Sequence, residues 1–367
     1  MLVEEAVKTV ESYIKRIKQI HKNYSCSNIV YRGEIEDYKE NSCRPNVFRE
    51  SAFYQNKHYE KNILDEMTAL NINNGNNYLF KAINAQHGGF PSRLLDITFN
   101  ALVALHFAIN PHYTKTWPEK IKECDQKDGV VYVFFFDEMY CATSDIIQNC
   151  YNALIKRDDN YFIDSYIFSQ NYKLIDHIKL NDRIIAQNGG FILFPGNEFH
   201  PIPDWMFKKI IIPAGSKADI RLELKELFGI DNGTMYPEVS NQVPFITDKS
   251  SYINNSEYSN EHEISLFIRF LDNECENFIT NTLYSDYLKK GKDINLIVLQ
   301  YRDFEKKLKI YSEQFEKLYS DLIGDKNNMN NNYLEISRKK FNKIINAFQI
   351  AVREIIKEKG KREIEML

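Results

Sequence analysis

AQHGGFPSRLLDITFNALVALHFA, residues 85–108, is the stretch around which the rest of the chain can be arranged. It combines glycine, proline, arginine, aspartate and histidine with side chains that are otherwise apolar enough for a protein core. Polar groups in an apolar setting need a structural or a chemical reason. We therefore expect this stretch to form part of any functional site.

The stretch is predicted to run as helix, glycine turn, strand and helix. Glycine adopts the left-handed cap of a helix at low cost, and the residue before a proline disfavours helical backbone. Thr98 or Asn100 is predicted to cap the second helix, whose small and apolar side chains indicate burial on several faces. The predicted segments are a helix over residues 78–86, the turn Gly88-Gly89, extended chain over 90–96 and a helix over 101–109.

The segments on either side alternate between the two kinds of secondary structure. Apolar residues at three- and four-residue spacing predict helices, and short runs of β-branched and aromatic residues predict buried strands. Residues 1–246 are therefore predicted to form an α+β domain, a small mixed sheet flanked by helices. The predicted helices are 2–22, a helix through 54–70, a short helix capped by Asn181 and 217–227; the predicted strands are 29–31, 130–136, the segment after Gly189-Gly190 and 208–214.

The C-terminal part of the chain carries a purely helical pattern. Near-heptad apolar stripes run over residues 294–322 and 341–355, separated by the Asn-rich segment 325–332. Two antiparallel helices of this kind must cover each other or a partner. We therefore expect a linker over residues 247–263 and a helical hairpin or small bundle over 264–367, which mediates homo-oligomerisation or binds a protein partner.

Length and composition indicate a folded, reduced, cytoplasmic protein. At about 150 residues per domain, a chain of 367 residues has room for roughly two domains. The formal net charge of -4 argues against nonspecific nucleic-acid binding by the whole chain. The six cysteines form no CxxC pair and none has metal-ligand spacing with a histidine, so no metal site is predicted. Neither a signal peptide nor a run of about 18 apolar residues occurs, so no membrane partner is expected.

The predicted C-terminal helix is locally basic. Between Ile336 and Arg362, nine basic residues face two acidic ones, Glu354 and Glu358. A basic face of this kind contacts nucleic acid in some proteins, and in most it is the solvated side of an amphipathic helix. Both interpretations stay open at this point.

Five motifs stand out for their glycine and polar residues: YRG (31–33), PNVFRE (45–50), QHGGFPSRLLDITFNALVALHFA (86–108), RIIAQNGGF (183–191) and GIDNGTMYP (229–237). Their order and content resemble the FRG domain, a prokaryotic family named for its F/Y-R-G sequence. The long motif is close to the family's Q-H-x-G-x-P-T-R-L-L-D-W-T-x-N-P-L-x-A-L-Y-F-A, from which the chain departs at Ser92, Ile97, Ala101 and His106. This resemblance, over residues 10–245, implies a polar pocket in a protein of mobile-element or phage-defence neighbourhoods, without a settled reaction.

A weaker resemblance is to the ADP-ribosyltransferases. Their strand-borne arginine, Ser/Thr-bearing second strand and later strand with an acidic residue are similar to Arg32, residues 96–98 and the strand after Gln187. The resemblance implies an NAD-dependent ADP-ribosyltransferase or NAD glycohydrolase-like enzyme with NAD as its cofactor, in which Arg32 holds the pyrophosphate. In these enzymes the acidic residue stabilises the cationic sugar. Gln187 stands near the position of that acidic residue and carries no negative charge, so Glu34 or Asp96 would have to supply it.

Polar residues from separate motifs are thus predicted to converge on one pocket for a nucleotide-like ligand. The repeated AQxGGF sequence has two interpretations: two similar helix C-caps, in which Gln86 and Gln187 satisfy backbone groups at the glycine turns, or two glutamines that face one cleft from the ends of two helices. The predicted catalytic residues are Gln187, His87 and Glu34, and the predicted ligand-binding residues are Tyr31, Arg32, Gln86, Arg93, Asp96, Thr98 and Arg183.

A structural role for the same residues is the alternative. Arg32 and Arg93 can pair with Glu34, Glu50 or Asp96 in a buried network, and structural ion pairs of this kind are at least as common as phosphate clamps. In that case the domain is a non-catalytic interaction module.

Overall fold

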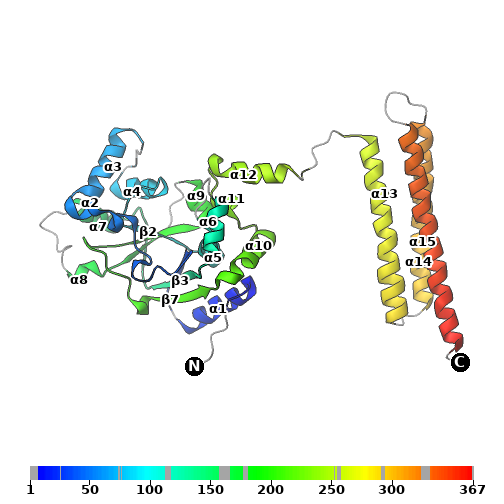
Figure 1. Ribbon diagram of the computed structural model, residues 1–367, viewed down its shortest axis with the longest axis horizontal. Coiled ribbons are helices and arrows are strands. Elements are labelled where there is room, and N and C mark those ends of the chain that lie inside the picture. The colour runs from blue at the N-terminus through cyan, green and yellow to red at the C-terminus, as the bar shows by residue number, and fades with distance from the viewer. Residues whose placement is uncertain are drawn as a thin grey trace. The chain divides into compact units, whose positions relative to one another are not determined.

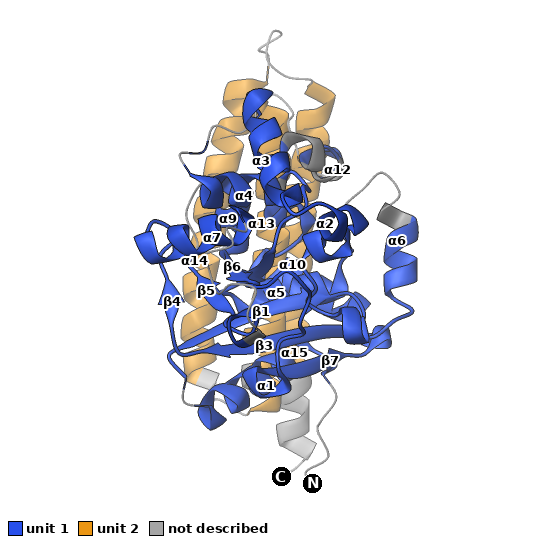
Figure 2. Cartoon of the chain, turned by 90° about the vertical axis from the view of Figure 1, so that its left-hand side faces the viewer, with its two compact units in different colours: residues 1–252 blue, residues 253–367 orange. Residues whose placement is uncertain are grey.

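Figure 1 shows a computed structural model of the chain, which describes residues 7–24, 26–72, 75, 77–111, 117–156, 166–176, 181–251, 253, 258–290, 294–323 and 331–365. The chain divides into two compact units, Met1–Tyr252 and Ile253–Leu367, which are coloured separately in Figure 2. They are called unit 1 and unit 2 below.

Unit 1 is built on a mixed seven-stranded sheet. Its strands are β1 Asn28–Glu34, β2 Leu94–Thr98, β3 Gly129–Phe136, β4 Met139–Tyr140, β5 Lys173–Ile175, β6 Gly189–Leu193 and β7 Phe207–Ile212. They lie in the order β4-β5-β6-β2-β1-β3-β7, and all neighbours are antiparallel except β4 and β5, which are parallel. Helices flank this sheet (Figure 1), so the predicted α+β class is confirmed.

The helices of unit 1 connect these strands. They are α1 Val10–Asn23, η1 Lys39–Asn41, η2 Asn46–Arg49, α2 Ser51–Gln55, α3 Tyr59–Ala69, α4 Tyr78–His87, α5 Ala101–Ile109, α6 Trp117–Cys124, α7 Asp145–Lys156, α8 Tyr166–Ser169, α9 Asp182–Gln187, η4 Asp204–Met206, η5 Ala214–Ser216, α10 Lys217–Phe228, α11 Asn232–Met235 and α12 Val239–Ser250. Helix α5 begins and ends where the apolar pattern predicts. Helix α9 is capped by Asn181, whose side chain accepts a hydrogen bond from the backbone N–H of Ile184, as predicted.

The two faces of the central strands are covered by different elements. On one face, Tyr31 and Val131 pack with residues of α1, α5 and α10. On the other face, Val30 and Val130 pack with Phe48 of η2 and with residues of α2. Successive strand side chains point to opposite faces, so a strand that is covered on both sides needs an apolar residue at nearly every position. This explains the continuous apolar run of β3.

Helix α5 lies so close to the sheet that two strand positions have no room for a side chain. A Cβ atom at Gly33 would lie 1.9 Å from the carbonyl oxygen of Ala104, and one at Gly129 would lie 2.1 Å from that of Ala108. Both obstacles are helix backbone, which cannot move aside as a flexible side chain does. The glycine of the YRG motif therefore sets the distance between β1 and α5.

The central strands β1 and β2 are joined over a very short length. Their register contains one residue pair, Tyr31 with Thr98. On either side of this junction the pairing is extensive, with five register pairs between β2 and β6 and seven between β1 and β3. The sheet therefore consists of two half-sheets, β4-β5-β6-β2 and β1-β3-β7.

Two predicted helices of unit 1 have different bounds in the structure. The helix predicted over residues 2–22 begins at Val10, because the Thr9 side chain accepts a hydrogen bond from the N–H of Ser12 in a capping box; residues 2–6 lie outside the described residues. The helix predicted through 54–70 is two helices, α2 and α3. The Asn56 side chain accepts a hydrogen bond from the N–H of His58 and turns the chain between them.

Unit 2 is helical, as predicted for the C-terminal part. Its helices are α13 Asn260–Asn277, which continues as a π-helical segment η6 Phe278–Lys289, α14 Ile294–Leu322 and α15 Asn331–Glu365. The two expected helices correspond to α14 and α15, and α13 with η6 adds a further helical segment against them, through contacts such as Phe267 with Phe341. Residues 247–250 and 260–263 of the predicted linker are helical, at the end of α12 and the start of α13.

The basic face of α15 is partly used within unit 2. Arg338 forms an ion pair with Glu316 of α14 at 2.6 Å and lies over the ring of Tyr319. Lys339 and Lys343 are exposed, and the side chains of residues 358–367 lie outside the described part of the chain. Among the described residues, no helix has the length and apolar character needed to cross a membrane.

Candidate functional site

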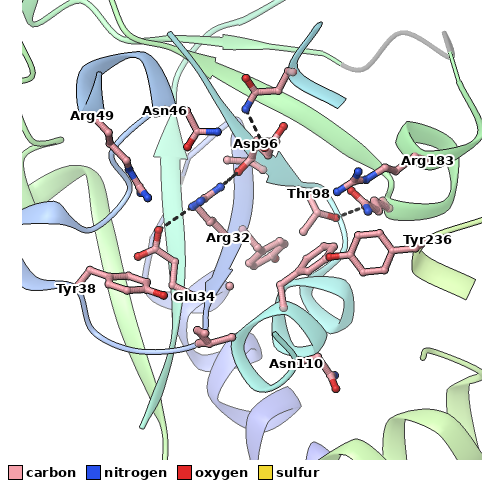
Figure 3. Close-up of a pocket in the computed structure, with 17 residues that line it drawn as sticks. Arg32, Glu34, Tyr38, Asn46, Arg49, Asp96, Thr98, Asn110, Arg183 and Tyr236 are labelled. Carbon is pink, nitrogen blue, oxygen red and sulfur yellow. Dashed lines mark hydrogen bonds and ion pairs between the residues drawn. The ribbon is translucent and has the colours of Figure 1, made fainter. Parts of the chain in front are cut away.

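A polar cavity of about 360 Å³ lies at the junction of the two half-sheets (Figure 3). Its walls come from β1, β2, the segment around η1 and η2, and the ends of α4, α5 and α9. The two glutamines of the AQxGGF repeats both line it, from the ends of α4 and α9. The predicted site residues that line the cavity are Tyr31, Arg32, Glu34, Gln86, Asp96, Thr98, Arg183 and Gln187.

Arg32 is held at the junction of the half-sheets. Its Nε donates to Oε1 of Glu34 at 3.0 Å and its Nη1 donates to the backbone carbonyl of Asp96 at 2.6 Å (Figure 3). Burial alone lowers the pKa of Arg32, but the nearby acidic groups, Glu34 first among them, outweigh burial and raise it. One guanidinium thus ties β1 to β2 beside their single register pair.

Glu34 is a buried carboxylate with one oxygen in use. Its Oε1 accepts hydrogen bonds from Arg32 and from the backbone N–H of Cys43, at 3.1 Å for the latter. Its Oε2 is buried and has no hydrogen-bond partner among the described residues. A buried carboxylate oxygen without a donor is costly, and such groups call for an explanation.

Asp96 presents a second carboxylate to the cavity. Its side chain is exposed, and Oδ2 accepts a hydrogen bond from Nε2 of Gln86 at 3.0 Å. The other end of the Gln86 amide accepts a hydrogen bond from the hydroxyl of Ser92 at 2.6 Å. The carboxylates of Glu34 and Asp96 therefore lie on either side of Arg32 (Figure 3).

The wall formed by α9 is fixed to its neighbours by two hydrogen bonds. The Thr98 hydroxyl donates to the carbonyl of Gln187 at 2.7 Å, and the Gln187 amide donates to the carbonyl of Met235 at 3.0 Å. Of the two residues predicted as possible caps of α5, Asn100 takes that position and accepts from the N–H of Leu102, which confirms the prediction at Asn100. Thr98 instead accepts a hydrogen bond from the N–H of Asn100 and connects β2 to α9.

Arg183 and Tyr236 form another part of the wall. The guanidinium carbon of Arg183 lies 4.8 Å from the centre of the Tyr236 ring, and its nearest carboxylate is that of Glu238 at 3.8 Å. Burial raises the pKa of Tyr236 to about 12. Arg183 therefore places a positive charge in the wall, between the Tyr236 ring and the carboxylate of Glu238.

Arg93, a predicted ligand-binding residue, does not line the cavity, and its ion-pair partner is Glu60 and none of Glu34, Glu50 and Asp96. The Arg93 side chain is 1 % exposed; its Nε donates to Oε2 of Glu60 at 2.7 Å and its Nη1 donates to the carbonyl of Gly196 at 3.0 Å. Tyr151 donates to the other Glu60 oxygen at 2.8 Å. Residues an odd number apart in extended chain point to opposite faces, which separates Arg93 from Asp96.

Residues that the sequence did not single out also line the cavity. Asn46 and Arg49 are exposed residues of η2 and lie inside the PNVFRE motif, and Tyr236 lies inside the GIDNGTMYP motif. Tyr38 and Asn110 belong to no quoted motif, and nothing in their sequence context marked them. The side chain of His87, a predicted catalytic residue at the end of α4, lies outside the described part of the chain.

Asn110 connects the cavity to a buried histidine. Its amide nitrogen donates to the carbonyl of His106 and lies 3.0 Å from His106 Nδ1, and its oxygen accepts from Nε of Arg221 at 2.9 Å. The amide therefore makes Nδ1 of His106 an acceptor, and the neutral ring carries its proton on Nε2. Burial lowers the pKa of His106 to about 4.

The buried His106 should make unit 1 less stable in mild acid. The folded protein holds the ring neutral down to a pKa of about 4, whereas the unfolded chain protonates near 6.5, so the unfolded state binds more protons between these values. The free energy of unfolding is expected to fall by on the order of 3 kcal/mol as the pH decreases through this window. Urea unfolding at a series of pH values measures the slope.

His106→Gln is expected to flatten this part of the pH dependence, because glutamine does not titrate. The exposed His58 offers a matched control, and His58→Gln should keep the slope of the parent protein. Equal slopes in the His106→Gln variant and the parent would contradict a buried neutral ring.

Comparison with known families gives one match. Residues 27–116 match the family model of the FRG domain, which confirms the resemblance of the motifs over this part of the chain. The match spans β1 to α5 and includes Arg32, Glu34, Arg49, Gln86 and Asp96. Neither the curated proteins nor the solved structures contain a significant match to the chain.

Proposed function

We propose that unit 1, with its FRG domain, binds a nucleotide-like small molecule in the cavity at the half-sheet junction, and that the protein acts as a cytoplasmic prokaryotic effector or sensor, in phage defence. One observation supports this proposal most. Three arginines and two carboxylates from distant parts of the chain line the same cavity: Arg32, Arg49, Arg183, Glu34 and Asp96.

The charges of the cavity match the chemistry of a nucleotide. Guanidinium groups suit phosphate oxygens, because their planar donors bind two oxygens at once. Ionised carboxylates are acceptors only, so Glu34 and Asp96 suit the hydroxyl or amino groups of a sugar or a base. The lining residues carry three positive and two negative charges, an excess that favours an anionic ligand.

The size of the cavity limits the ligand. Its volume of about 360 Å³ is near the lower end of the range, roughly 300–1,000 Å³, that small-molecule sites occupy. A mononucleotide is expected to be largely enclosed. A dinucleotide such as NAD is expected to extend beyond the cavity.

Isothermal titration calorimetry with AMP, GMP, ADP-ribose and NAD tests the proposal on the full chain. We expect at least one of them to bind and Arg49→Ala to weaken that binding by about tenfold or more, the usual cost of losing a hydrogen bond to a charged group. Arg49 is exposed, so its loss should leave folding intact. Arg302→Ala, an exposed arginine on α14, is the matched control and should bind as the parent does. If none of the four compounds binds the parent protein, the proposal is wrong.

A catalytic use of the cavity, by NAD-dependent ADP-ribosyl transfer or NAD hydrolysis, has less support. The residue nearest the expected acid is Gln187, and its amide already donates to the carbonyl of Met235. An amide supplies no negative charge for a cationic sugar. Glu34 and Asp96 are the carboxylates that line the cavity, and ligand binding alone accounts for both.

We extend the proposal to unit 2, which would mediate self-association or bind a protein partner. Its helices leave several large apolar side chains exposed to solvent, which an associating partner could cover. They include Leu266, Phe270, Leu299, Ile310 and Ile350.

A further inference from the structure

Ser92 has a hydroxyl whose hydrogen bonds are fully determined. The residue is buried, and its Oγ accepts a hydrogen bond from the backbone N–H of Leu94 at 3.1 Å. A hydroxyl has one proton to donate, and the partner in reach is Oε1 of Gln86 at 2.6 Å. Ser92 is therefore a donor toward Gln86.

This donor fixes the orientation of the Gln86 amide. With Oε1 facing the hydroxyl, Nε2 faces Oδ2 of Asp96 at 3.0 Å. The flipped amide would set its oxygen against the carboxylate of Asp96, where no proton lies between two acceptors. The hydrogen bonds thus run in one direction, from Ser92 through Gln86 to Asp96.

The far end of this chain is the exposed carboxylate of the cavity. Asp96 lies beside Arg32, whose Nη1 already donates to the Asp96 backbone carbonyl. A carboxylate without the Gln86 donor would be free to rotate toward the guanidinium and occupy its remaining donors. Gln86 holds Asp96 away from that position and leaves both groups open to a ligand.

We infer that Ser92 and Gln86 are positioning residues, which orient the Asp96 carboxylate as a hydrogen-bond acceptor for the ligand and keep Arg32 available. This inference rests on the proposed ligand-binding function of the cavity. It gives a physical reason for a glutamine, a hydroxyl residue and an aspartate at these places in one motif. Ser92 also orders the opposite wall, because its carbonyl accepts from the N–H of Val47 in η2.

Affinity measurements on Ser92 variants test the inference with the same four compounds. Ser92→Ala is expected to weaken binding by about tenfold, the effect of losing one oriented hydrogen bond. Ser92→Thr keeps the hydroxyl and is expected to bind within about twofold of the parent. If Ser92→Ala, shown to be folded by its cooperative unfolding, binds as tightly as the parent, Ser92 does not position Asp96.

A thermodynamic cycle tests the chain of hydrogen bonds without any ligand. Ser92→Ala and Asp96→Asn are combined, and the urea midpoints of the single and double variants are compared. If the three side chains are linked by hydrogen bonds, the shifts in the urea midpoint should be non-additive. The non-additivity should disappear when Gln86→Ala is also present. Additive shifts would overturn the inference, even if a nucleotide binds. Non-additive shifts in a protein that binds none of the four compounds would instead overturn the proposed function alone.

Discussion

Replacing Arg93 with alanine is expected to destabilise unit 1 by about 3–5 kcal/mol, the usual cost of breaking a buried ion pair. The variant would leave the carboxylate of Glu60, itself 3 % exposed, without its charged partner. For a unit of this size the loss corresponds to a fall in melting temperature of roughly 6–20 °C. Both tryptophans, Trp117 and Trp205, belong to unit 1, so fluorescence-detected unfolding of the full chain reports this unit.

Two further variants make this expectation specific. The double variant Arg93→Met with Glu60→Leu replaces the pair by apolar side chains of similar volume and should recover a large part of the stability, because no charge stays buried alone. Arg49→Ala removes an exposed arginine and should change the melting temperature little. An Arg93→Ala protein that melts at the same temperature as the parent would show that the Arg93–Glu60 pair does not stabilise unit 1.

Gly33→Ala is also expected to destabilise unit 1 strongly, by about 3 kcal/mol or more. The added methyl group would lie 1.9 Å from the carbonyl oxygen of Ala104 and 2.6 Å from the amide nitrogen of Ala108, so β1 and α5 would have to separate. Because β1 carries Arg32 and Glu34, we expect nucleotide binding to be lost together with stability. Soluble yield, unfolding midpoint and calorimetry measure the effect.

Gly215→Ala is the matched control for this substitution. A Cβ atom at Gly215 meets nothing within 4 Å, so the same chemical change should leave the unfolding midpoint nearly unchanged. If Gly33→Ala were as stable as Gly215→Ala, the close approach of α5 to β1 would be wrong.

The sequence was most informative where one local pattern determines an element. Helix α5 has its predicted bounds, because the cap at Asn100 and a continuous apolar run agree. Strand β1 is longer than the predicted residues 29–31, since its second half is held by pairing with β3 and not by its own apolar pattern. The break between α2 and α3 depends on one side-chain hydrogen bond of Asn56, which periodicity does not reveal.

The sequence predicted which residues line the site better than it predicted how they are arranged. The motifs supplied residues that the structure brings together from both half-sheets, including Arg32, Asp96 and Arg183. The alternation of side chains in extended chain was enough to predict that Arg93 and Asp96 point to opposite faces. It could not identify Glu60 as the ion-pair partner of Arg93, because Glu60 is distant in sequence. Asn46 and Arg49 reach the cavity because η2 is held by a long-range backbone hydrogen bond to Ser92, and no local signal encodes such a contact.

The single register pair between β1 and β2 has a consequence for the dynamics of unit 1. The boundary between two cooperative units of a sheet is where its backbone hydrogen bonds are fewest, and here that boundary passes through the cavity. A molecule that contacts both half-sheets stabilises the closed sheet. Its binding free energy is added to the free energy needed to separate the half-sheets. Under the proposed ligand-binding function, occupancy of the site and sub-global opening of the sheet are linked quantities, and a higher ligand concentration is expected to make separation of the two half-sheets rarer.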